Sequence, residues 1–483
     1  MYRRTKIVAT VGPASETPER LNALFEAGVD VFRLNFSHGD HPSKAVVIRL
    51  IRELSRRHMR AVSILADLQG PKIRTGRMLG GTLRLTTGSE VTVTTRDVLG
   101  EDHLIPTIYQ GLPHDVGPGD RILLDDGLME LRVLAVEGED VRCSVVTGGI
   151  LKDRKGMNLP GAKISAPALT EKDREDLDFC IGEEVDYIAL SFVRQPSDVL
   201  ELKELLRAQD SELRVIAKIE KPEAVTNFDA ILDASDGIMV ARGDLGVEIN
   251  PEKVPLIQKR IIRACNQAGK PVITATQMLE SMVHNPRPTR AETSDVANAI
   301  LDGTDAVMLS AETASGDYPL EAVYMMVQVA ADVEGDPELE AQVFRRVPEE
   351  GVSQLAEVIG QAACRVAESV NAAAILAFTQ TGSTAALVSK YRPHVPIIAV
   401  TPHQKVRRRM ALYAGVHSLR VDIEGDTEAQ IRSVEEAVLA TGAFKAGELV
   451  VITMGSPLSS PGTTNLLKIH RLGQPGAGVP SNS

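Results

Sequence analysis

The chain has 483 residues, which is too long for one ordinary domain and suggests two to four. A formal net charge of −12 and the absence of Trp argue against nucleic acid as a main partner, although local Arg and Lys can still bind a small anion. No apolar run approaches the length of a membrane span and no signal peptide follows Met1, so we expect a cytoplasmic protein without a membrane partner.

Short apolar runs alternate with helix signals from residue 5 to about residue 335, which indicates parallel strand–helix units. Helix starts are marked by Thr17-Pro18 and Asn250-Pro251, each a cap followed by a proline. Eight runs can be counted, which favours a closed (β/α)8 barrel over an open sheet. The runs are KIVATVG (6–12), VFRLNFS (31–37), SILADLQG (63–70), YIALSF (187–192), VIAKIE (215–220), IMVARGD (238–244), VITATQ (272–277) and VMLSAE (307–312).

All of these runs except the first end in polar residues, and most of those residues come in pairs two positions apart. Residues two apart on a strand face the same side, and a barrel builds its active site from the C-terminal ends of its strands. The residues are Arg33, Asn35, Ser37, Asp67, Ser191, Lys218, Glu220, Arg242, Asp244, Thr274, Thr276, Ser310 and Glu312. A single Lys-x-Glu pair is also compatible with a salt bridge that closes a barrel layer, but seven polar endings in one chain favour an active site.

The alternation is interrupted once, by residues 71–165, which have β character and many Gly, Pro and Asp residues. We expect this segment to form a small β-barrel lid domain over the mouth of a catalytic barrel built from residues 1–70 and 166–340. A C-terminal α/β domain is expected at 341–472, and the Gly/Pro/Ser-rich tail at 473–483 is expected to be disordered.

The strand-end residues predict phosphoryl chemistry. Glu220 and Asp244 can hold a divalent cation through oxygen and leave positions for substrate and water, an arrangement that Mg²⁺ favours. Lys218, Arg242 and Arg33 add positive charge, which neutralises a transferring phosphoryl group. The segment RGDLG also offers a glycine-rich turn whose backbone amides are suited to a carboxylate.

Several motifs in this chain resemble those of the pyruvate kinase family. They occur in order between residue 5 and about residue 472, and several are long. They are KIVATVGPAS, FRLNFSHG, DLQGPKIRTG, KGMNLPG, AKIEKPEAV, MVARGDLGVE, TATQMLESM, PRPTRAETSDVANAILDGTDAVMLSAETASGDYPLEAV and TQTGST. The resemblance implies phosphoryl transfer from phosphoenolpyruvate to ADP, protonation of the enolate to pyruvate, and a homotetramer.

The resemblance also implies roles for individual residues. Lys218 would stabilise charge on the migrating phosphoryl group and the enolate oxygen, and Arg33 would contact that phosphoryl group. Glu220 and Asp244 would hold Mg²⁺, and a second Mg²⁺ would arrive with the nucleotide. Gly243, Asp244 and Thr276 would bind the substrate, with Thr276 on the face where the proton arrives, and Ser310 and Glu312 would support a water chain that delivers the proton. Asn35, His38, Arg74 and Lys155 match positions on the nucleotide side.

The monovalent-cation site of the family is matched by Asn35, Ser37, Asp67 and the Leu68 carbonyl. K⁺-dependent members have Glu where this chain has Lys72, and Thr-Lys where it has Leu68-Gln69. A lysine ammonium supplies the same single positive charge as K⁺, so we predict activity without K⁺. The alternative is that Lys72 points to solvent.

The third domain carries a second motif, in which Thr379, Thr381, Gly382, Ser383 and Thr384 lie between a strand and a helix. Hydroxyls and free amides at a helix N-terminus suit a phosphate, and the loop SPLSSPGTTN (456–465) is placed to close over it. In the family this pocket binds an activating sugar phosphate or stays empty. The later loop lacks the Trp and Arg of members that respond to a bisphosphate, so a monophosphate effector is preferred. An ordinary capped turn is the structural alternative.

Two other functions compete with the kinase. A lyase of the related phosphoenolpyruvate/pyruvate barrels shares the acidic Mg²⁺ site, but it needs neither the lid nor the nucleotide-side motifs. A catalytically silent metabolite sensor would need only the third domain, and the intact Lys218, Glu220, Asp244 and Thr276 argue against it.

Overall fold

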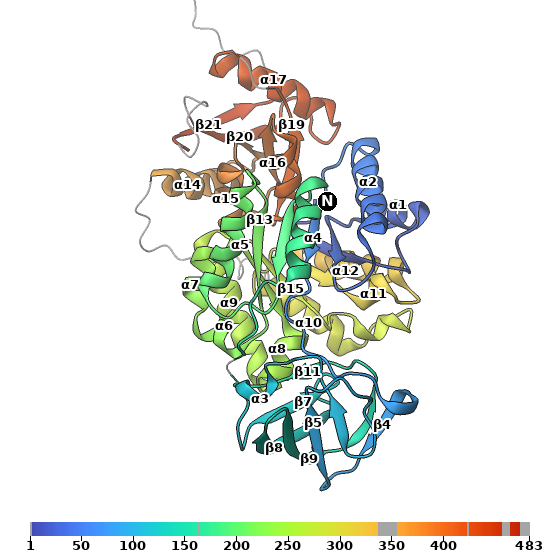
Figure 1. Cartoon of the computed structure of the whole chain (residues 1–483). Helices are drawn as coiled ribbons and strands as arrows, with labels where there is room; N and C mark the ends of the chain where they lie inside the picture. Colours follow the sequence, from blue (N-terminus) through green and yellow to red (C-terminus); the bar gives the residue numbers. More distant parts are fainter. Residues whose placement is uncertain (1, 163, 337–354, 423–424, 456–463, 474–483) are drawn as a thin grey trace, which may run out of the picture.

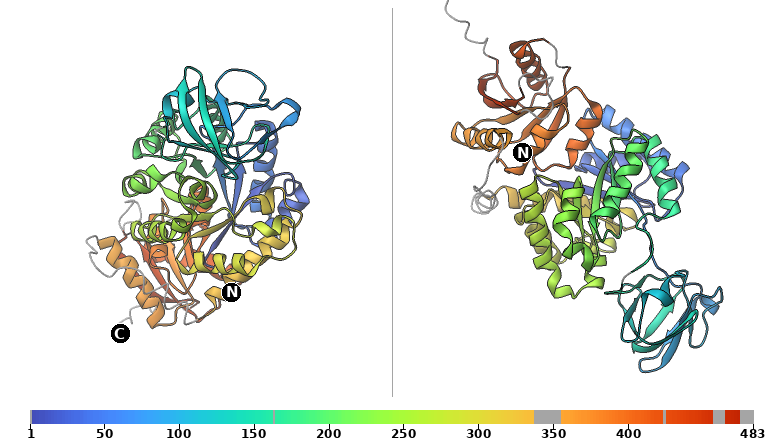
Figure 2. Two further views of the ribbon diagram at one scale, coloured as in Figure 1. Left: turned by 90° about the horizontal axis from the view of Figure 1, so that it is seen from below. Right: turned by 60° about the vertical axis from the view of Figure 1, so that its left-hand side comes forward.

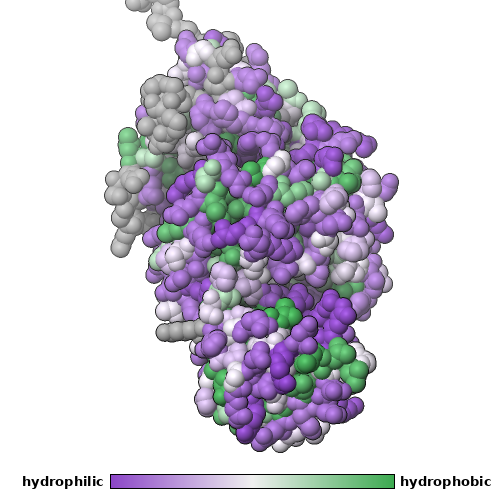
Figure 3. Space-filling model, viewed as in Figure 1, coloured by the Kyte–Doolittle hydropathy of each residue, from purple (hydrophilic) through white to green (hydrophobic). Residues whose placement is uncertain are grey.

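The computed structural model describes residues 2–162, 164–336, 355–422, 425–455 and 464–473. Figure 1 shows three parts in a row, with the barrel in the middle, the β lid at one end and the C-terminal α/β domain at the other. The visible face in Figure 3 is mostly hydrophilic, with hydrophobic side chains in small groups. Within the described residues, no helix is both long enough and apolar enough to cross a membrane.

The predicted closed barrel is confirmed. Its eight strands are parallel and follow the order β1-β16-β15-β14-β13-β12-β3-β2 around the ring. They coincide with the eight apolar runs of the sequence. The strands are β1 (Lys6–Val11), β2 (Val31–Asn35), β3 (Ser63–Asp67), β12 (Tyr187–Leu190), β13 (Arg214–Ile219), β14 (Gly237–Ala241), β15 (Val272–Ala275) and β16 (Ala306–Leu309).

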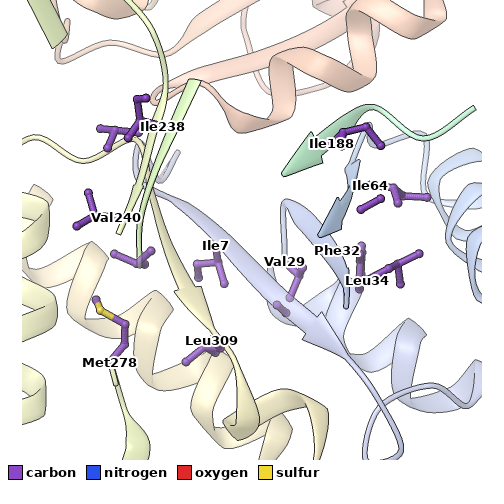
Figure 4. Close-up of a cluster of buried hydrophobic side chains, with 14 of the residues drawn as sticks. Ile7, Val29, Phe32, Leu34, Ile64, Ile188, Ile238, Val240, Met278 and Leu309 are labelled. Atoms are coloured by element: carbon purple, nitrogen blue, oxygen red, sulfur yellow. The ribbon is translucent and has the colours of Figure 1, made fainter. Parts of the chain in front are cut away.

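Helices surround the strands and bury their apolar faces against them. Figure 4 shows part of this core, where Ile7, Phe32 and Ile238 lie among other side chains from the strands. The surrounding helices are α1 (Pro18–Ala27), α2 (His41–Arg57), α4 (Glu171–Gly182), α5 (Pro196–Ala208), α6 (Pro222–Thr226), α7 (Phe228–Ala234), α9 (Val254–Ala268), α10 (Arg290–Leu301) and α12 (Pro319–Glu334). Short helices at strand ends are α8 (Arg242–Glu248), α11 (Ala311–Ala314), η2 (Pro251–Lys253) and η3 (Glu280–Val283).

The predicted helix boundaries differ in one place. Thr17 caps α1 through a hydrogen bond from Arg20 N, as the sequence predicts, and Gly269 ends α9 in the left-handed region with a φ of 67°. Asn250-Pro251 instead opens the 3₁₀ turn η2, without a side-chain cap, and α9 begins only at Val254.

The lid lies between β3 and β12 and has its own hydrophobic core. Six of its strands form one sheet, in the order β11-β7-β8-β9-β5-β6, and β10 pairs with β4. Figure 2 shows the lid at one end of the barrel, joined to it by two connecting segments. Its elements are η1 (Leu79–Gly81), β4 (Thr82–Leu85), β5 (Glu90–Thr94), β6 (Leu104–Pro106), α3 (Leu112–Asp115), β7 (Arg121–Leu124), β8 (Met129–Glu137), β9 (Asp140–Thr147), β10 (Gly149–Lys152) and β11 (Met157–Asn158).

One buried carboxylate holds both connections of the lid. Asp173, the third residue of α4, accepts hydrogen bonds from Gly70 N at 3.1 Å and from Thr170 N at 2.9 Å. Gly70 lies where the chain leaves the barrel, and its φ of 66° is in the left-handed region that favours glycine. The carboxylate therefore fixes the hinge of the lid on both sides.

The described part of the C-terminal domain has a five-stranded sheet in the order β19-β18-β17-β20-β21, in which β21 runs antiparallel to its neighbour and the other described strands are parallel. Its elements are α14 (Leu355–Ser369), β17 (Ala374–Phe378), α15 (Ser383–Lys390), β18 (Ile397–Thr401), α16 (Gln404–Arg409), η4 (Met410–Leu412), β19 (Val416–Arg420), α17 (Thr427–Ala440), β20 (Leu449–Met454) and β21 (Leu466–Arg471). Residues 341–354 of the predicted C-terminal domain, most of the loop 456–465 and residues 474–483 of the predicted tail lie outside the described residues.

This domain closes the N-terminal end of the barrel. Lys6 Nζ donates to Val416 O at 2.7 Å, and Tyr187 Oη donates to Arg409 O at 2.8 Å. Leu412 is fully buried in the barrel interior beside residues such as Val8 and Leu65. The lid and the C-terminal domain therefore occupy opposite ends of the barrel, and only the lid faces the C-terminal strand ends.

Candidate active site

Asp67 joins two of the predicted cationic residues at the barrel mouth. It ends β3 with an exposed fraction of 1%, accepts from Arg33 Nε at 2.7 Å and lies 3.2 Å from Lys218 Nζ. Burial acts to raise the pKa of Asp67, but the charges of Lys218 and Arg33 outweigh it and bring the pKa below its ordinary value. Asp67 is therefore an ionised carboxylate that fixes both cations.

Lys218 is the centre of this cluster. Its Nζ lies 2.8 Å from Glu220 Oε1 and donates to Ser191 Oγ at 2.8 Å. Burial acts to lower the pKa of Lys218, but the carboxylates of Asp67 and Glu220 raise it above its ordinary value. The side chain is therefore a permanent, desolvated ammonium, which interacts strongly with an anion brought beside it.

Glu220 and Asp244 form a carboxylate pair in which Glu220 is buried. Glu220 Oε2 accepts from Phe192 N at 2.9 Å, whereas Asp244 lies half-buried on α8. Burial and the negative charge of Asp244 raise the pKa of Glu220, while Lys218 opposes them. A divalent cation would relieve this repulsion. Among the described residues no three His, Cys, Asp or Glu side chains are grouped so that they could hold a metal ion, and the two carboxylates alone would leave coordination positions open, as Mg²⁺ favours.

Thr276 follows β15 with a strained backbone. Its φ is 68°, in the left-handed region that β-branched residues rarely adopt, and Gln277 follows with a φ of 53°. Its Oγ1 accepts from Gly243 N at 2.7 Å and donates to Ala275 O at 2.6 Å. Strain of this kind persists where surrounding contacts hold it, often at functional sites.

The expectation that Arg242 adds charge beside the metal carboxylates is wrong. Its guanidinium donates to Thr276 O at 2.8 Å and pairs with Asp295 at 2.7 Å, so it supports the strained turn. β14 ends at Ala241 and α8 begins at Arg242, so the rule that residues two apart share a face does not apply there. For the same reason RGDLG is the start of a helix, and not a glycine-rich turn.

Ser310 and Glu312 lie just after β16. Glu312 Oε2 accepts from Ser310 N at 2.7 Å, and its Oε1 accepts from Leu279 N at 3.1 Å. Burial raises the pKa of Glu312. Ser310 Oγ is buried without a hydrogen-bond partner among the described residues, so it is free to bind a water molecule or substrate atom.

Thr10 was missed in the sequence. It lies on β1 opposite Arg33 of β2, accepts from Arg33 Nη1 at 3.0 Å, and donates to Leu309 O at 2.8 Å. The first run differs from the other seven because its last two residues, Val11 and Gly12, are apolar. The signal in the sequence is Thr10 itself, the residue directly before Val11, which lies buried beside the strand that carries Arg33.

Of the four residues predicted for the nucleotide side, Asn35, His38, Arg74 and Lys155, the last has no described contact with those of the barrel. His38 has a pKa below its ordinary value because of partial burial and then the charges of Arg74, Lys72, Lys44 and Arg33, so these cations surround one region of the mouth. Lys155, on the lid, pairs with Asp125 at 2.8 Å. No described contact joins Lys155 to the barrel residues of the set.

The predicted cation-site residues make separate contacts. Asn35 Oδ1 accepts from Ser37 N at 3.0 Å, and Leu68 O accepts from Ser191 Oγ at 2.8 Å. Lys44 Nζ donates to Asn35 O at 3.0 Å. Among the described contacts there is none between the Lys72 ammonium and Asp67.

The phosphate motif of the C-terminal domain forms the turn before α15. Gly382 has a φ of 96° and donates its amide to Thr379 Oγ1 at 2.8 Å. Thr381 Oγ1 donates to Ser383 Oγ at 3.1 Å, and Thr384 Oγ1 lies 3.0 Å from Thr464 Oγ1. The large cleft beside Thr381, about 1110 Å³, lies between this domain and the barrel, and its lining includes Arg207, Arg214, Lys405 and Arg420.

A desolvated ammonium, a fixed guanidinium and two carboxylates suited to Mg²⁺ meet at the strand ends beneath a hinged lid. That combination defines a phosphotransferase of the (β/α)8 barrel class. Two family models match the chain, the pyruvate kinase barrel domain over residues 2–323 and the pyruvate kinase alpha/beta domain over residues 357–470.

Individual relatives agree with the models. The chain is 50% identical to a pyruvate kinase of Geobacillus stearothermophilus over 97% of this chain and 80% of the relative, and 48% identical to one of Staphylococcus aureus over 98% and 81%. A crystal structure of a pyruvate kinase from Cryptosporidium parvum superposes with a TM-score of 0.90 at 40% identity, covering 97% of this chain and 96% of that one. The chain belongs to the pyruvate kinase family and transfers a phosphoryl group from phosphoenolpyruvate to ADP, giving pyruvate and ATP.

Proposed function

We propose that the Arg33–Asp67–Lys218 cluster is the phosphoryl-binding centre of this reaction. The observation that carries the proposal is the buried Lys218 ammonium, held 2.8 Å from Glu220 and 3.2 Å from Asp67. Arg33 binds the phosphoryl oxygens while Lys218 offsets the charge that develops on the phosphoryl group and the enolate oxygen. Their positions are set before substrate arrives, so little reorganisation accompanies the reaction.

Glu220 and Asp244 are the residues that would hold Mg²⁺. When bound, the ion neutralises charge on phosphoryl oxygens. The substrate carboxylate is assigned to Gly243, Asp244 and Thr276. The strained Thr276 places its hydroxyl beside the Gly243 amide, on the face where the enolate carbon is protonated. Ser310 Oγ, with its free hydrogen-bonding capacity, and the raised-pKa carboxyl of Glu312 support the route of that proton.

A coupled assay of pyruvate formation with and without ADP tests the proposal. The parent should form pyruvate far faster with ADP than without it, and Lys218→Met should reduce the rate with ADP at least about 10³-fold, the scale of a lost charge-stabilising group. Pyruvate formation at the same rate with and without ADP would favour the lyase, and its absence under both conditions would favour the sensor. Equal rates for Lys218→Met and the parent would refute the assigned centre.

Asn35, His38, Arg74 and Lys155 are proposed to bind the nucleotide. The cations around His38 support this assignment because they suit the ADP phosphates. Lys155→Ala should raise KM for ADP about tenfold while leaving KM for phosphoenolpyruvate nearly unchanged, since one exposed charge contact is lost on the nucleotide side alone. An unchanged KM for ADP would remove Lys155 from the set.

Activity without K⁺ is also proposed, on the charge of Lys72 near the site of Asn35, Ser37, Asp67 and Leu68. Arg33 and Lys218 already neutralise Asp67, which supports a site that needs no monovalent ion. The parent should be fully active in K⁺-free buffer, and Lys72→Glu should become dependent on added KCl. Strong activation of the parent by KCl would overturn this assignment.

A phosphorylated effector, most simply a sugar monophosphate, is proposed at Thr379–Thr384. The hydroxyl-rich turn and the basic cleft beside Thr381 support it. The double variant Thr381→Ala/Ser383→Ala should lose activation and keep the unactivated rate, and retained activation would refute the assignment. A homotetramer is proposed from family membership, and light scattering at assay concentration tests it.

A further inference from the structure

A buried ion pair outside the catalytic set connects the two elements that carry the proposed metal carboxylates. Lys221 directly follows Glu220, and Glu248 is the last residue of α8, the helix of Asp244. Lys221 Nζ lies 2.5 Å from Glu248 Oε1, and both side chains are nearly inaccessible. Buried ion pairs add little net stability compared with apolar packing, so the significance of this one lies in what it positions.

The lid contacts the same carboxylate. Asn158, in the edge strand β11, donates from Nδ2 to Glu248 Oε1 at 2.8 Å. Figure 1 shows β11 next to α8, at the junction of the two parts. Glu248 thus receives one hydrogen bond from the lid and one from the barrel on a single oxygen.

The lid hinge meets Lys221 through an aromatic side chain. Lys221 Nζ lies 5.6 Å from the centre of the Phe192 ring, and Phe192 N donates to Glu220. A Cβ placed on Gly70 at the hinge would lie 2.8 Å from Phe192 Cδ2, so hinge and ring are in close contact. Both ends of the lid, its hinge and its edge strand, therefore connect to Lys221.

We propose that Asn158, Glu248 and Lys221 form a latch that holds the lid closed and positions Glu220 and Asp244 at the same time. These three are positioning residues, and the inference rests on the proposed active site at the barrel mouth. Closure excludes water. When the latch fails, water competes with ADP for the phosphoryl group. The water oxygen attacks phosphorus and releases a proton, and the bond from phosphorus to the enol oxygen breaks. The enolate then takes up a proton, so the products are pyruvate and inorganic phosphate.

The test uses Asn158→Ala in the full-length chain, with Arg96→Ala as the matched lid control because its pair with Asp140 is partly exposed and within the lid. Inorganic phosphate release from phosphoenolpyruvate is measured without ADP. Lid position is measured by spin-label distances between Ile108→Cys on the lid and Leu200→Cys on the barrel, both exposed. The four native cysteines are buried, so labelling is selective.

Loss of one hydrogen bond to a charged group should shift lid closure about tenfold. Asn158→Ala should therefore raise phosphate release about tenfold and add a population at longer distance, while Arg96→Ala matches the parent. If both variants match the parent in both measurements, the latch is refuted.

A second variant separates a latch from a purely structural pair. Lys221→Met/Glu248→Leu replaces the pair with apolar groups, so it should unfold at nearly the parental temperature and still show the opened lid and the raised phosphate release. A closed lid with parental release in this variant would also overturn the proposal. If Lys155→Ala leaves KM for ADP unchanged while Asn158→Ala opens the lid, only the nucleotide assignment fails.

Discussion

Replacing Asp67 with Asn tests how far one buried carboxylate stabilises the active site. The amide keeps the shape of the side chain, but it removes the negative charge shared by Arg33 and Lys218. One end of the amide can still accept from Arg33, while the other presents a donor toward the Lys218 ammonium. The variant should therefore fold into the same barrel with a weaker and misaligned cation cluster.

The size of the effect follows from two distances. At an effective dielectric constant of about 20, attraction across the 3.2 Å between Lys218 and Asp67 is about 5 kcal/mol. Breaking a buried pair costs roughly 3–5 kcal/mol in measured cases. Lys218 keeps Glu220 at 2.8 Å, so we expect the lower value, about 3 kcal/mol. For a domain of 150–250 residues, this lowers the unfolding temperature by roughly 6–12 °C.

Thermal unfolding followed by circular dichroism, together with the coupled assay, measures both consequences. Asp140→Asn, whose carboxylate is partly exposed in the lid, is the control and should change stability by less than about 1 kcal/mol. The pKa of Asp67 is lowered in the folded protein, so its contribution is present above the unfolded pKa of about 3.9 and is lost as pH falls through the folded value. The difference between parent and Asp67→Asn should therefore shrink toward low pH. A constant difference, or equal stability at pH 7, would refute the reasoning.

Three further substitutions have outcomes set by single contacts. Thr276→Gly should change the free energy of unfolding by no more than about 1 kcal/mol, because relief of the left-handed strain offsets the conformational entropy that glycine loses on folding. Pyruvate formation should nevertheless fall at least about tenfold, because the hydroxyl beside Gly243 is lost, and a parental rate would contradict the role of Oγ1. The pKa of Glu312 is raised in the folded protein, so the parent should lose stability relative to Glu312→Gln as pH rises through the folded pKa. Denaturant unfolding at several pH values measures this loss, and a constant difference in unfolding free energy between parent and variant across that pH range would contradict the raised pKa. Gly382→Ala should destabilise the C-terminal domain by about 2 kcal/mol, because φ is 96° at this position and the new Cβ would lie 2.5 Å from Met410 Cε. Thermal unfolding measures the change, and an unchanged transition temperature would show that the turn accommodates the methyl group without strain.

The sequence predicted those parts of the site in which strand geometry extends to the functional residue. Arg33 and Asp67 lie within their strands, and Glu220 directly follows β13, so period-two alternation places all three at the barrel mouth together with Lys218. The apolar runs likewise predicted all eight barrel strands, because parallel strands buried on both faces are nearly continuous in hydrophobicity.

The same rule fails where a helix begins directly after the strand. At Arg242 the chain is already helical. Residues two apart in a helix are rotated by about 200° around the helix axis, so Arg242 and Asp244 face nearly opposite directions. Thr276 leaves β15 in a left-handed turn that no propensity predicts, and Thr10 acts through a cross-strand contact that depends on register. Local patterns do not encode such tertiary contacts.

The burial of Leu412 inside the barrel has a consequence for how this enzyme is assembled. A fragment that ends after α12 would keep every proposed catalytic side chain but would leave an apolar socket open to water at the floor of the strands. The C-terminal domain therefore closes the floor of the barrel and shields its interior from water. Neither the barrel nor the C-terminal domain can be treated as a removable module, and any rotation of the C-terminal domain acts directly on the residues at the starts of the barrel strands.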